Sequence, residues 1–200
     1  IRHSEKVFLM KRLLLILILT LSFHTLSKAD DIRDFEIEGM SIGDSALDFF
    51  DESDIKNNSQ DYFRDKTYTP VQNDSYSFFK VYDAVDFSFI TGDNKYILHS
   101  INGILFYDNK DINECYIMMD KITSEIQSNI NYIKKTNKKV STHSADKTGK
   151  SKYTHVSFTL NNGYITVTCY NYSVEHGSQN HLSVSVDTKK FYDWVVSGIY

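Results

Sequence analysis

The chain has 200 residues, of which 22 are Lys or Arg and 26 are Asp or Glu, so its formal net charge is −4. From Asp30 onward the balance is 25 acidic to 17 basic residues, a net charge of −8. This acidic surplus argues against general nucleic-acid binding, which requires a basic surface. The part of the chain from Asp30 to Tyr200 fits a single domain large enough to bury a hydrophobic core.

The segment 1–29 carries the pattern of an export signal. Two basic residues at 11–12 precede an apolar run over 13–21, and Ser27 and Ala29 occupy the positions that a signal peptidase reads. The run is about half of the ~20 apolar residues that a transmembrane helix needs. We therefore expect upstream sequence and a cleaved signal peptide over 1–29, no transmembrane segment in the mature domain over 30–200, and a periplasmic or secreted protein.

The segment 30–65 is acidic, with 12 acidic residues against three basic ones. Within it, residues 39–45 predict a turn that leads into a short helix through Phe50, and a second short helix is expected from Asp51 to about Asn58. The expected packing residues of this segment are Met40, Ile42, Leu47, Phe50 and Ile55.

A strand-rich part follows a loop that Pro70 and the polar residues 72–75 predict. Apolar residues at 85, 87 and 89 alternate with polar ones, as in a half-buried strand, and 96–101 is expected to return as its partner. The Asn102-Gly103 pair predicts either a second tight turn or a bulge before a third strand over 104–107.

A long amphipathic helix is predicted over 111–133. Asp111 and Glu114 have the spacing of a capping box at its start. Four lysines between 134 and 139 would place positive charge at its C-terminus. Its apolar stripe consists of Ile112, Cys115, Met119, Ile122, Ile126, Ile130 and Ile133.

The last third of the chain contains the clearest hairpin. A polar loop over 136–151 precedes two alternating strands, which a turn at Asn161-Asn162-Gly163 connects. Leu182, Val184 and Val186, separated by serines, predict a third strand. Asp187 or Thr188 is expected to cap a final short helix that buries Phe191, Trp194 and Val195 and stops at Gly198. The pattern predicts an α+β fold, with an antiparallel sheet of about six strands covered by one long helix and short helices at both ends.

The two cysteines, Cys115 and Cys169, both fall on predicted apolar faces. In an exported chain such a pair favours a disulfide, whereas two buried free thiols are the alternative. A bridge would tie the first turn of the long helix to the second hairpin, and we predict that the two sulfur atoms are neighbours.

Motifs for chemistry are weak. Residues 147–151 end like a phosphate-binding loop but lack its first glycine, since position 144 is Ser144, so we interpret them as a flexible basic loop. The sequence contains no catalytic serine elbow, and Asp108 to Glu114 lacks the ligand spacing of a calcium loop. The five histidines of the mature chain lack the paired spacing of a zinc site. We therefore predict no catalytic residues, no metal and no cofactor.

Tyrosine is abundant, and a row formed by Tyr164, Tyr170 and Tyr172 is expected on the sheet face away from the long helix. Such a face either binds a ligand or partner or is simply solvated. The lysine-rich residues 134–152 either pack near the acidic first segment or meet an anionic surface such as lipid headgroups or polysaccharide.

Two resemblances bear on the fold. The run from Gly39 to Phe50, the second short helix and the following strands resemble the helix-helix-three-strand layout of the BamE-type outer-membrane assembly lipoproteins, over about 34–107. The chain differs from them in having no lipidated cysteine, and its long helix and second hairpin have no counterpart. With few arginines and abundant Lys, Asn and Ile, the whole chain is similar to small secreted proteins of unknown function from marine bacteria with AT-rich genomes.

The leading functional hypothesis is a non-enzymatic protein that binds a small ligand or an unknown partner in the bacterial envelope, with binding residues unknown from sequence. The first alternative is an exported hydrolase, in which the fold gathers His143, Asp146, His176 and His181. The second is a structural or assembly factor of the envelope, which the BamE-type resemblance implies.

Overall fold

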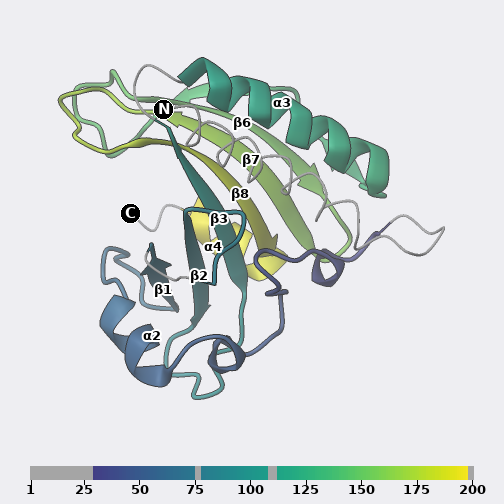
Figure 1. The fold of residues 1–200 in the computed structure, drawn as a ribbon, viewed down its shortest axis with the longest axis vertical. Helices are drawn as coiled ribbons and strands as arrows, with labels where there is room; N and C mark the ends of the chain where they lie inside the picture. The colour runs from purple at the N-terminus through teal and green to yellow at the C-terminus, as the bar shows by residue number, and fades with distance from the viewer. Residues whose placement is uncertain (1–28, 75–77, 108–111, 198–200) are drawn as a thin grey trace.

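A computed structural model of the protein describes residues 29–74, 78–107 and 112–197 (Figure 1). Eight strands form one antiparallel sheet in the order β1-β2-β3-β8-β7-β6-β4, and β5 also pairs with β6. The strands are β1 (Tyr68–Asn73), β2 (Ala84–Ile90), β3 (Ser100–Tyr107), β4 (Lys134–Lys135), β5 (Lys139–Thr142), β6 (Lys152–Thr159), β7 (Gly163–Asn171) and β8 (Asn180–Thr188). The α+β class is confirmed, and the sheet has two more strands than expected.

The sheet has two halves that meet in the middle. One half is β1-β2-β3 and the other is β6-β7-β8, and the chain passes between them through the long helix α3 (Ile112–Asn129). Strands β3 and β8 join the halves through continuous pairing from Ser100 opposite Asp187 to Tyr107 opposite Asn180. Because this pairing is unbroken, each face of the sheet runs through both halves, although β3 and β8 are far apart in the sequence.

The apolar face of the sheet carries the core. Helix α3 lies across β6, β7 and β8 (Figure 1) and buries Cys115, Met119, Ile122 and Ile126. The disulfide prediction is confirmed, since Cys115 is bridged to Cys169 of β7 with their Cα atoms 6.1 Å apart, and both residues are fully buried. The alternation of β7 turns Cys169 toward the helix, so the bridge fixes α3 to the sheet.

The N-terminal segment belongs to the same core. It contains two short 3-10 helices, η1 (Ile32–Asp34) and η2 (Ala46–Asp48), followed by helix α2 (Glu52–Asn58). Phe50 stacks on Phe87 of β2 with ring centroids 5.2 Å apart. Both predicted short helices are present, but Leu47 is 42% exposed and not part of the core, because the η2 turn directs it outward.

The long helix is shorter than predicted. It ends at Asn129, after which Ile130 bridges to Ala29 and the Ile133 N–H donates to the carbonyl of Thr159 at 2.8 Å. The chain is thus already joining the edge of β6, so Ile133 is 68% exposed and not part of the stripe. Asp111, the predicted first member of the capping box, lies outside the described residues.

Three predictions about the strands were wrong. Pro70 lies inside β1, where its missing N–H is tolerated because β1 is an edge strand. The pair Asn102-Gly103 makes neither a turn nor a bulge, and β3 runs through it in unbroken register with β2. Gly103 is required for packing instead, since a Cβ there would lie 2.5 Å from the ring of the buried Tyr82. The strand predicted to begin at Tyr96 begins at Ser100.

The lysine-rich segment is also more ordered than predicted. Lysines 134, 135 and 139 lie in the short strands β4 and β5, which cover the outer edge of β6. The segment 147–151 closes on the Asp146 carboxylate, which accepts hydrogen bonds from the N–H and hydroxyl groups of Thr148 and Ser151. These bonds lower the pKa of Asp146 well below its ordinary value.

The chain ends in helix α4 (Lys189–Val196), which lies on the side of the sheet opposite α3 (Figure 1). Thr188 caps it by accepting a hydrogen bond from the Phe191 N–H, while Asp187 is buried in the sheet. Phe191 is buried, Trp194 and Val195 are half-buried, and Gly198 lies outside the described residues. No helix among the described residues is long and apolar enough to cross a membrane.

Candidate functional site

The second face of the sheet, the one away from α3, is polar. Serines and threonines alternate with valines and isoleucines in β7 and β8. Because successive side chains of a strand point to opposite faces, the serines and threonines all lie on this side. The register sets them in four cross-strand rows: Ser88, Ser100 and Asp187; Asp86, Asn102, Ser185 and Thr166; Ile104, Ser183 and Thr168; and Phe106, His181, Tyr170 and Tyr153. We call this surface the polar face.

The polar face is sheltered from solvent. Ser88, Ser100, Thr168, Ser183 and Asp187 are each only 5–7% exposed. An ordinary solvated sheet face would leave such side chains open to water. Here α4 and the segment around Phe63 lie over one end of the face.

An aromatic cluster fixes that cover. The Tyr68 ring, on the polar face of β1, meets Phe191 and Trp194 of α4 with ring centroids 5.1 and 5.0 Å apart. Phe63 packs edge-on against Trp194 at 4.8 Å. The cluster holds α4 over the strand ends and leaves the middle of the polar face hollow.

Two adjoining hollows occupy this middle. One, of about 240 Å³, lies beside α4, and the other, of about 610 Å³, extends toward the loop that carries His143. Both are lined by Tyr62, Asp86, Asn102 and Tyr170, so they form one continuous depression, which we call the groove. Its overall size is in the range of clefts that hold small organic ligands, roughly 300–1,000 Å³.

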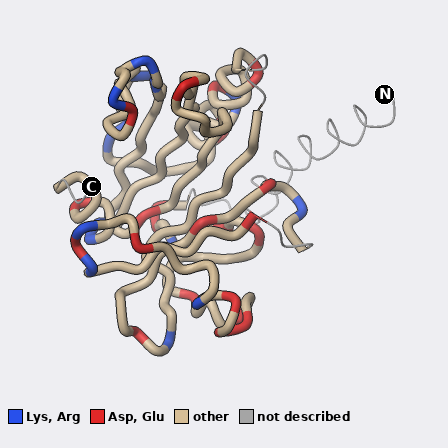
Figure 2. The backbone as a smooth tube through the Cα atoms, turned by 90° about the vertical axis from the view of Figure 1, so that its left-hand side faces the viewer, with Lys and Arg blue, Asp and Glu red and all other residues tan. Residues whose placement is uncertain are grey.

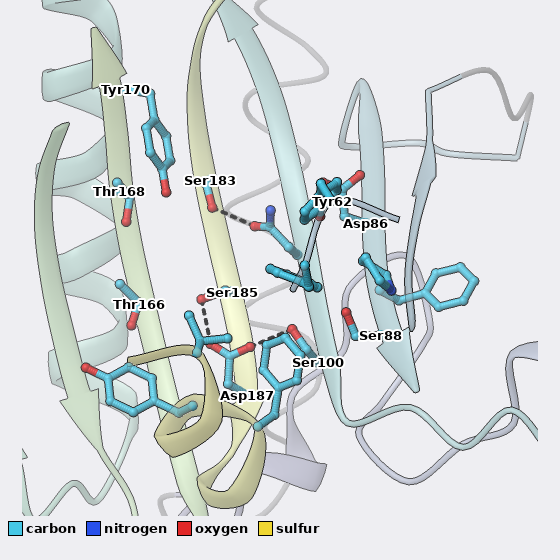
Figure 3. A pocket seen from close by; sticks show the side chains of 17 residues that line it. Tyr62, Asp86, Ser88, Ser100, Thr166, Thr168, Tyr170, Ser183, Ser185 and Asp187 are labelled. Carbon is cyan, nitrogen blue, oxygen red and sulfur yellow. Dashed lines mark hydrogen bonds between the residues drawn. The ribbon is translucent and has the colours of Figure 1, made fainter. Parts of the chain in front are cut away.

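Asp187 is the most enclosed acid of the groove. Figure 3 shows its carboxylate between two serines: the Ser100 Oγ donates to one oxygen at 2.6 Å and the Ser185 Oγ to the other at 3.0 Å. Burial raises the pKa of Asp187 to about 6, and the two serine bonds only partly oppose that rise. The serines therefore fix the carboxyl group in place without keeping it fully ionised.

Asp86 and Asn102 form the centre of the groove, on β2 and β3. They are cross-strand partners, and Asn102 accepts a hydrogen bond from the Ser183 Oγ at 2.6 Å. Burial raises the pKa of Asp86 to about 7, with nearby Asp74 adding to the rise and Gln72 opposing it. Near neutral pH this carboxyl group can therefore donate a hydrogen bond as well as accept one.

The histidines of the hydrolase hypothesis do come together at the far end. The rings of His143 and His176 lie 5.5 Å apart, and Tyr172 contacts both of them and His181. Burial lowers the pKa of His143, and the neighbouring His176 lowers it further.

The fourth residue of that hypothesis has a structural role. The Asp146 carboxylate also accepts a hydrogen bond from the Ser173 Oγ, so it holds the 146–151 loop to the loop that follows β7. In the described part of the chain, no histidine ring is hydrogen-bonded to a serine hydroxyl. No group of three or more His, Cys, Asp or Glu side chains among those residues is placed to hold a metal ion.

All three tyrosines of the expected row lie on the sheet face away from α3. Tyr170 and Tyr172 line the groove, whereas Tyr164 stacks on Tyr192 of α4 with ring centroids 3.9 Å apart. Sequence reasoning missed Asp86, Asn102 and Asp187. The alternating serines of β8 were visible as a pattern, but their partners on β2 and β3 come from a register that no local pattern reveals.

Comparison of the chain with protein-family models, with curated proteins and with solved structures found no match.

Proposed function

We propose that this protein is a non-enzymatic binding protein that holds a small polar ligand in the groove. The observation that carries the proposal is the shelter of the polar face: hydroxyl, amide and carboxyl groups line a hollow instead of facing bulk water. Buried polar groups are costly unless they are hydrogen-bonded, and the groove pairs several of its own: Ser100 and Ser185 with Asp187, and Ser183 with Asn102. A ligand would bond to the hydrogen-bonding capacity that the hydroxyl and amide groups retain beyond these pairs.

The disulfide supports a place outside the cytoplasm, because such bonds persist in oxidising compartments. We propose a periplasmic or secreted location on this ground together with the export pattern of the segment 1–29. Sequencing of the N-terminus of the protein recovered from a bacterial periplasm or medium tests it, and a start at Asp30 is expected.

The binding proposal is tested by thermal unfolding in the presence of individual sugars, amino acids, nucleosides, polyamines and small carboxylic acids. A ligand present at 100 times its Kd adds about 2.7 kcal/mol to the stability of the folded state. We expect at least one compound to raise the Tm of the wild-type protein.

Two phenylalanine variants locate the effect. Thr166→Phe fills the groove beside Ser185, and Ser128→Phe adds the same ring to the exposed face of α3. The Tm increase should persist in Ser128→Phe and disappear in Thr166→Phe. An equal increase in both variants, or no increase with any compound, would refute the groove as the binding site.

Hydrolysis in the same groove is the second candidate function, favoured by the raised pKa values of Asp86 and Asp187. A general acid needs a pKa near the working pH, and both carboxyl groups meet that condition. Against it, both oxygens of Asp187 are already held by serines. Turnover of common esters, phosphates or peptides that is lost in Asp86→Asn or His176→Ala would favour this candidate over simple binding.

An envelope assembly role stays a prediction. It is tested by co-purification, in which retention of outer-membrane components by the wild-type protein would favour a protein partner over a small ligand.

A further inference from the structure

An aromatic band crosses the polar face beside the hydroxyl-rich rows. Phe106, His181, Tyr170 and Tyr153 are cross-strand neighbours on β3, β8, β7 and β6. Their ring centroids follow one another at 6.2, 4.6 and 5.8 Å. Four adjacent strands thus contribute one ring each at the same level of the sheet, so the groove has an aromatic side and a hydroxyl side.

Tyr170 and Tyr172 extend this band along β7. Their ring planes are within 8° of parallel and their centroids are 5.8 Å apart. The rings of His143 and His176 brace Tyr172 from the loop side, at 5.1 and 4.7 Å. Both tyrosines line the larger hollow. Two nearly parallel aromatic rings therefore line the larger hollow next to its hydrogen-bonding groups.

The charge of the groove restricts what can bind there. Its lining contains no Lys or Arg among the described residues, and the backbone trace of Figure 2 has its Lys and Arg positions mostly in the outer loops. Anions therefore lack a counter-charge. Burial raises the pKa of Asp86 to about 7, so this carboxyl group is about half protonated at pH 7 and carries only part of a full negative charge at the centre of the groove.

The remaining groups are those that recognise hydroxyl-rich molecules. Serine and threonine hydroxyls donate and accept, the Asn102 amide does both, and a protonated Asp86 does both as well. A ligand with hydroxyls around its rim and an apolar C–H face would use the polar rows and the tyrosine rings together.

We propose that the groove binds a neutral carbohydrate chain, with Tyr170 and Tyr172 packed against the sugar rings and the row from Asp86 to Thr166 bonded to their hydroxyls. This inference rests on the proposed binding function and names its ligand class. A chain fits better than a single sugar, because the groove runs from α4 to the His143 loop through two hollows that share four lining residues.

Calorimetric titration with neutral hexasaccharides tests the ligand class. The probes are maltohexaose, cellohexaose, laminarihexaose, mannohexaose and xylohexaose, with hexagalacturonate as the anionic counterpart and spermidine as the cationic one. We expect at least one neutral hexasaccharide to bind, and hexagalacturonate and spermidine not to. Absence of binding by all five neutral probes at millimolar concentration overturns the inference.

Ring variants test the tyrosine platform. Tyr170→Ala should weaken binding of the neutral probe by about tenfold, which corresponds to about 1.4 kcal/mol for the loss of a ring packed on the ligand. Tyr170→Phe, which keeps the ring, should stay within about threefold of the wild-type affinity. Tyr116→Ala, on α3 at the other face of the sheet, is the matched control and should bind as the wild-type protein does. If Tyr170→Ala does not fold by circular dichroism, Tyr172→Ala replaces it.

The two proposals fail in different ways. In one outcome, spermidine or hexagalacturonate binds while the neutral sugars do not, and Thr166→Phe abolishes the binding of the charged probe. The groove is then a binding site, but not for neutral carbohydrate. If a neutral sugar binds equally well to the wild-type protein and to Thr166→Phe, the groove proposal itself is refuted. Loss of sugar binding in both Thr166→Phe and Tyr170→Ala supports both.

Discussion

At the scale of single residues, Glu38 combines an unusual backbone with a heavily used side chain. Its φ of 53° lies in the left-handed region that few non-glycine residues adopt. Its carboxylate accepts three backbone hydrogen bonds, from Lys80, Val81 and Tyr82, at 2.7–2.8 Å. These bonds attach the N-terminal segment to the chain entering β2, and so the strained conformation is stabilised by contacts with a distant part of the sequence.

Replacement of Glu38 tests that attachment. We expect Glu38→Ala to lower the free energy of unfolding by about 2–3 kcal/mol, because three backbone N–H groups lose an ionised acceptor. Glu38→Gln keeps a carbonyl oxygen that can serve Val81 and Tyr82 and should lose about half as much. Urea denaturation measures both variants, and equal stability of Glu38→Ala and the wild-type protein would contradict the interpretation.

Asp187 gives the protein a pH-dependent stability of defined sign. Its pKa of about 6 lies above the unfolded value of ~3.9, so between these two values the unfolded state releases a proton that the folded state keeps. Stability from this residue is therefore highest below about pH 4 and declines by about 3 kcal/mol as the pH rises through 6.

Asp187→Asn removes this titration while keeping an amide that the two serines can still bond. The difference in unfolding free energy between variant and wild-type protein should shift in favour of the variant from pH 4 to pH 7. Urea denaturation across this range measures it. Asp31 and Asp146, whose pKa values are lowered by their hydrogen-bond partners, act in the opposite direction below about pH 4 in both proteins and cancel in the difference. A pH-independent difference would show that the pKa of Asp187 is the same in the folded and unfolded states.

At the scale of elements, the disulfide makes α3 the link between the two parts of the core. Cys115 lies in the first turn of the helix and Cys169 near the end of β7, at a sequence separation of 54. In the chain-entropy model, closing a loop of this size contributes about 4 kcal/mol by restricting the unfolded state. The double variant Cys115→Ala/Cys169→Ala should lose about that amount in urea denaturation.

Reduction gives the matching control for the double variant. Both cysteines are fully buried, so the folded protein should resist dithiothreitol and become reducible only at urea concentrations that open the core. Rapid reduction of the native protein, or an unchanged stability of the double variant, would contradict this account.

The success of sequence reasoning also differs between elements. Helix α3 and the β6–β7 hairpin were predictable because long runs of one period and an Asn-Gly turn determine them locally. Strand β1 was missed because Pro70 indicates a loop unless its edge position is known. Gly103 was misinterpreted because the reason for it is the Tyr82 ring, a tertiary contact. The groove could be predicted only in part, since the alternating Ser183 and Ser185 are apparent from the sequence but their pairing with β3 is not.

At the scale of the whole molecule, both edges of the sheet are protected against pairing with other chains. Edge strand β1 carries Pro70 and is joined by Ser59 and Gln60, and the outer edge of β6 is covered by short lysine-bearing strands. Proline, lysine and short strand length are all features that block edge-to-edge association. The sequence suggested that the lysine-rich segment either packs near the acidic first segment or contacts an anionic surface, and the short strands β4 and β5 within it have a structural role in the fold.

The continuous β3–β8 pairing predicts that the two halves unfold together. Trp194, the only tryptophan of the chain, reports on α4 and the aromatic cluster at the β1 side of the groove. Its fluorescence and the far-UV circular dichroism of the sheet should give the same urea midpoint, since one core spans both halves. Tyr132, which packs on Phe158 of β6, supplies a probe at the opposite side of the sheet. In the double variant Tyr132→Trp/Trp194→Phe, the tryptophan fluorescence and the far-UV circular dichroism should give the same urea midpoint. A Trp194 transition at lower urea than the circular dichroism would instead mean that α4 leaves the sheet first, and the groove would then open at one end before the fold is lost.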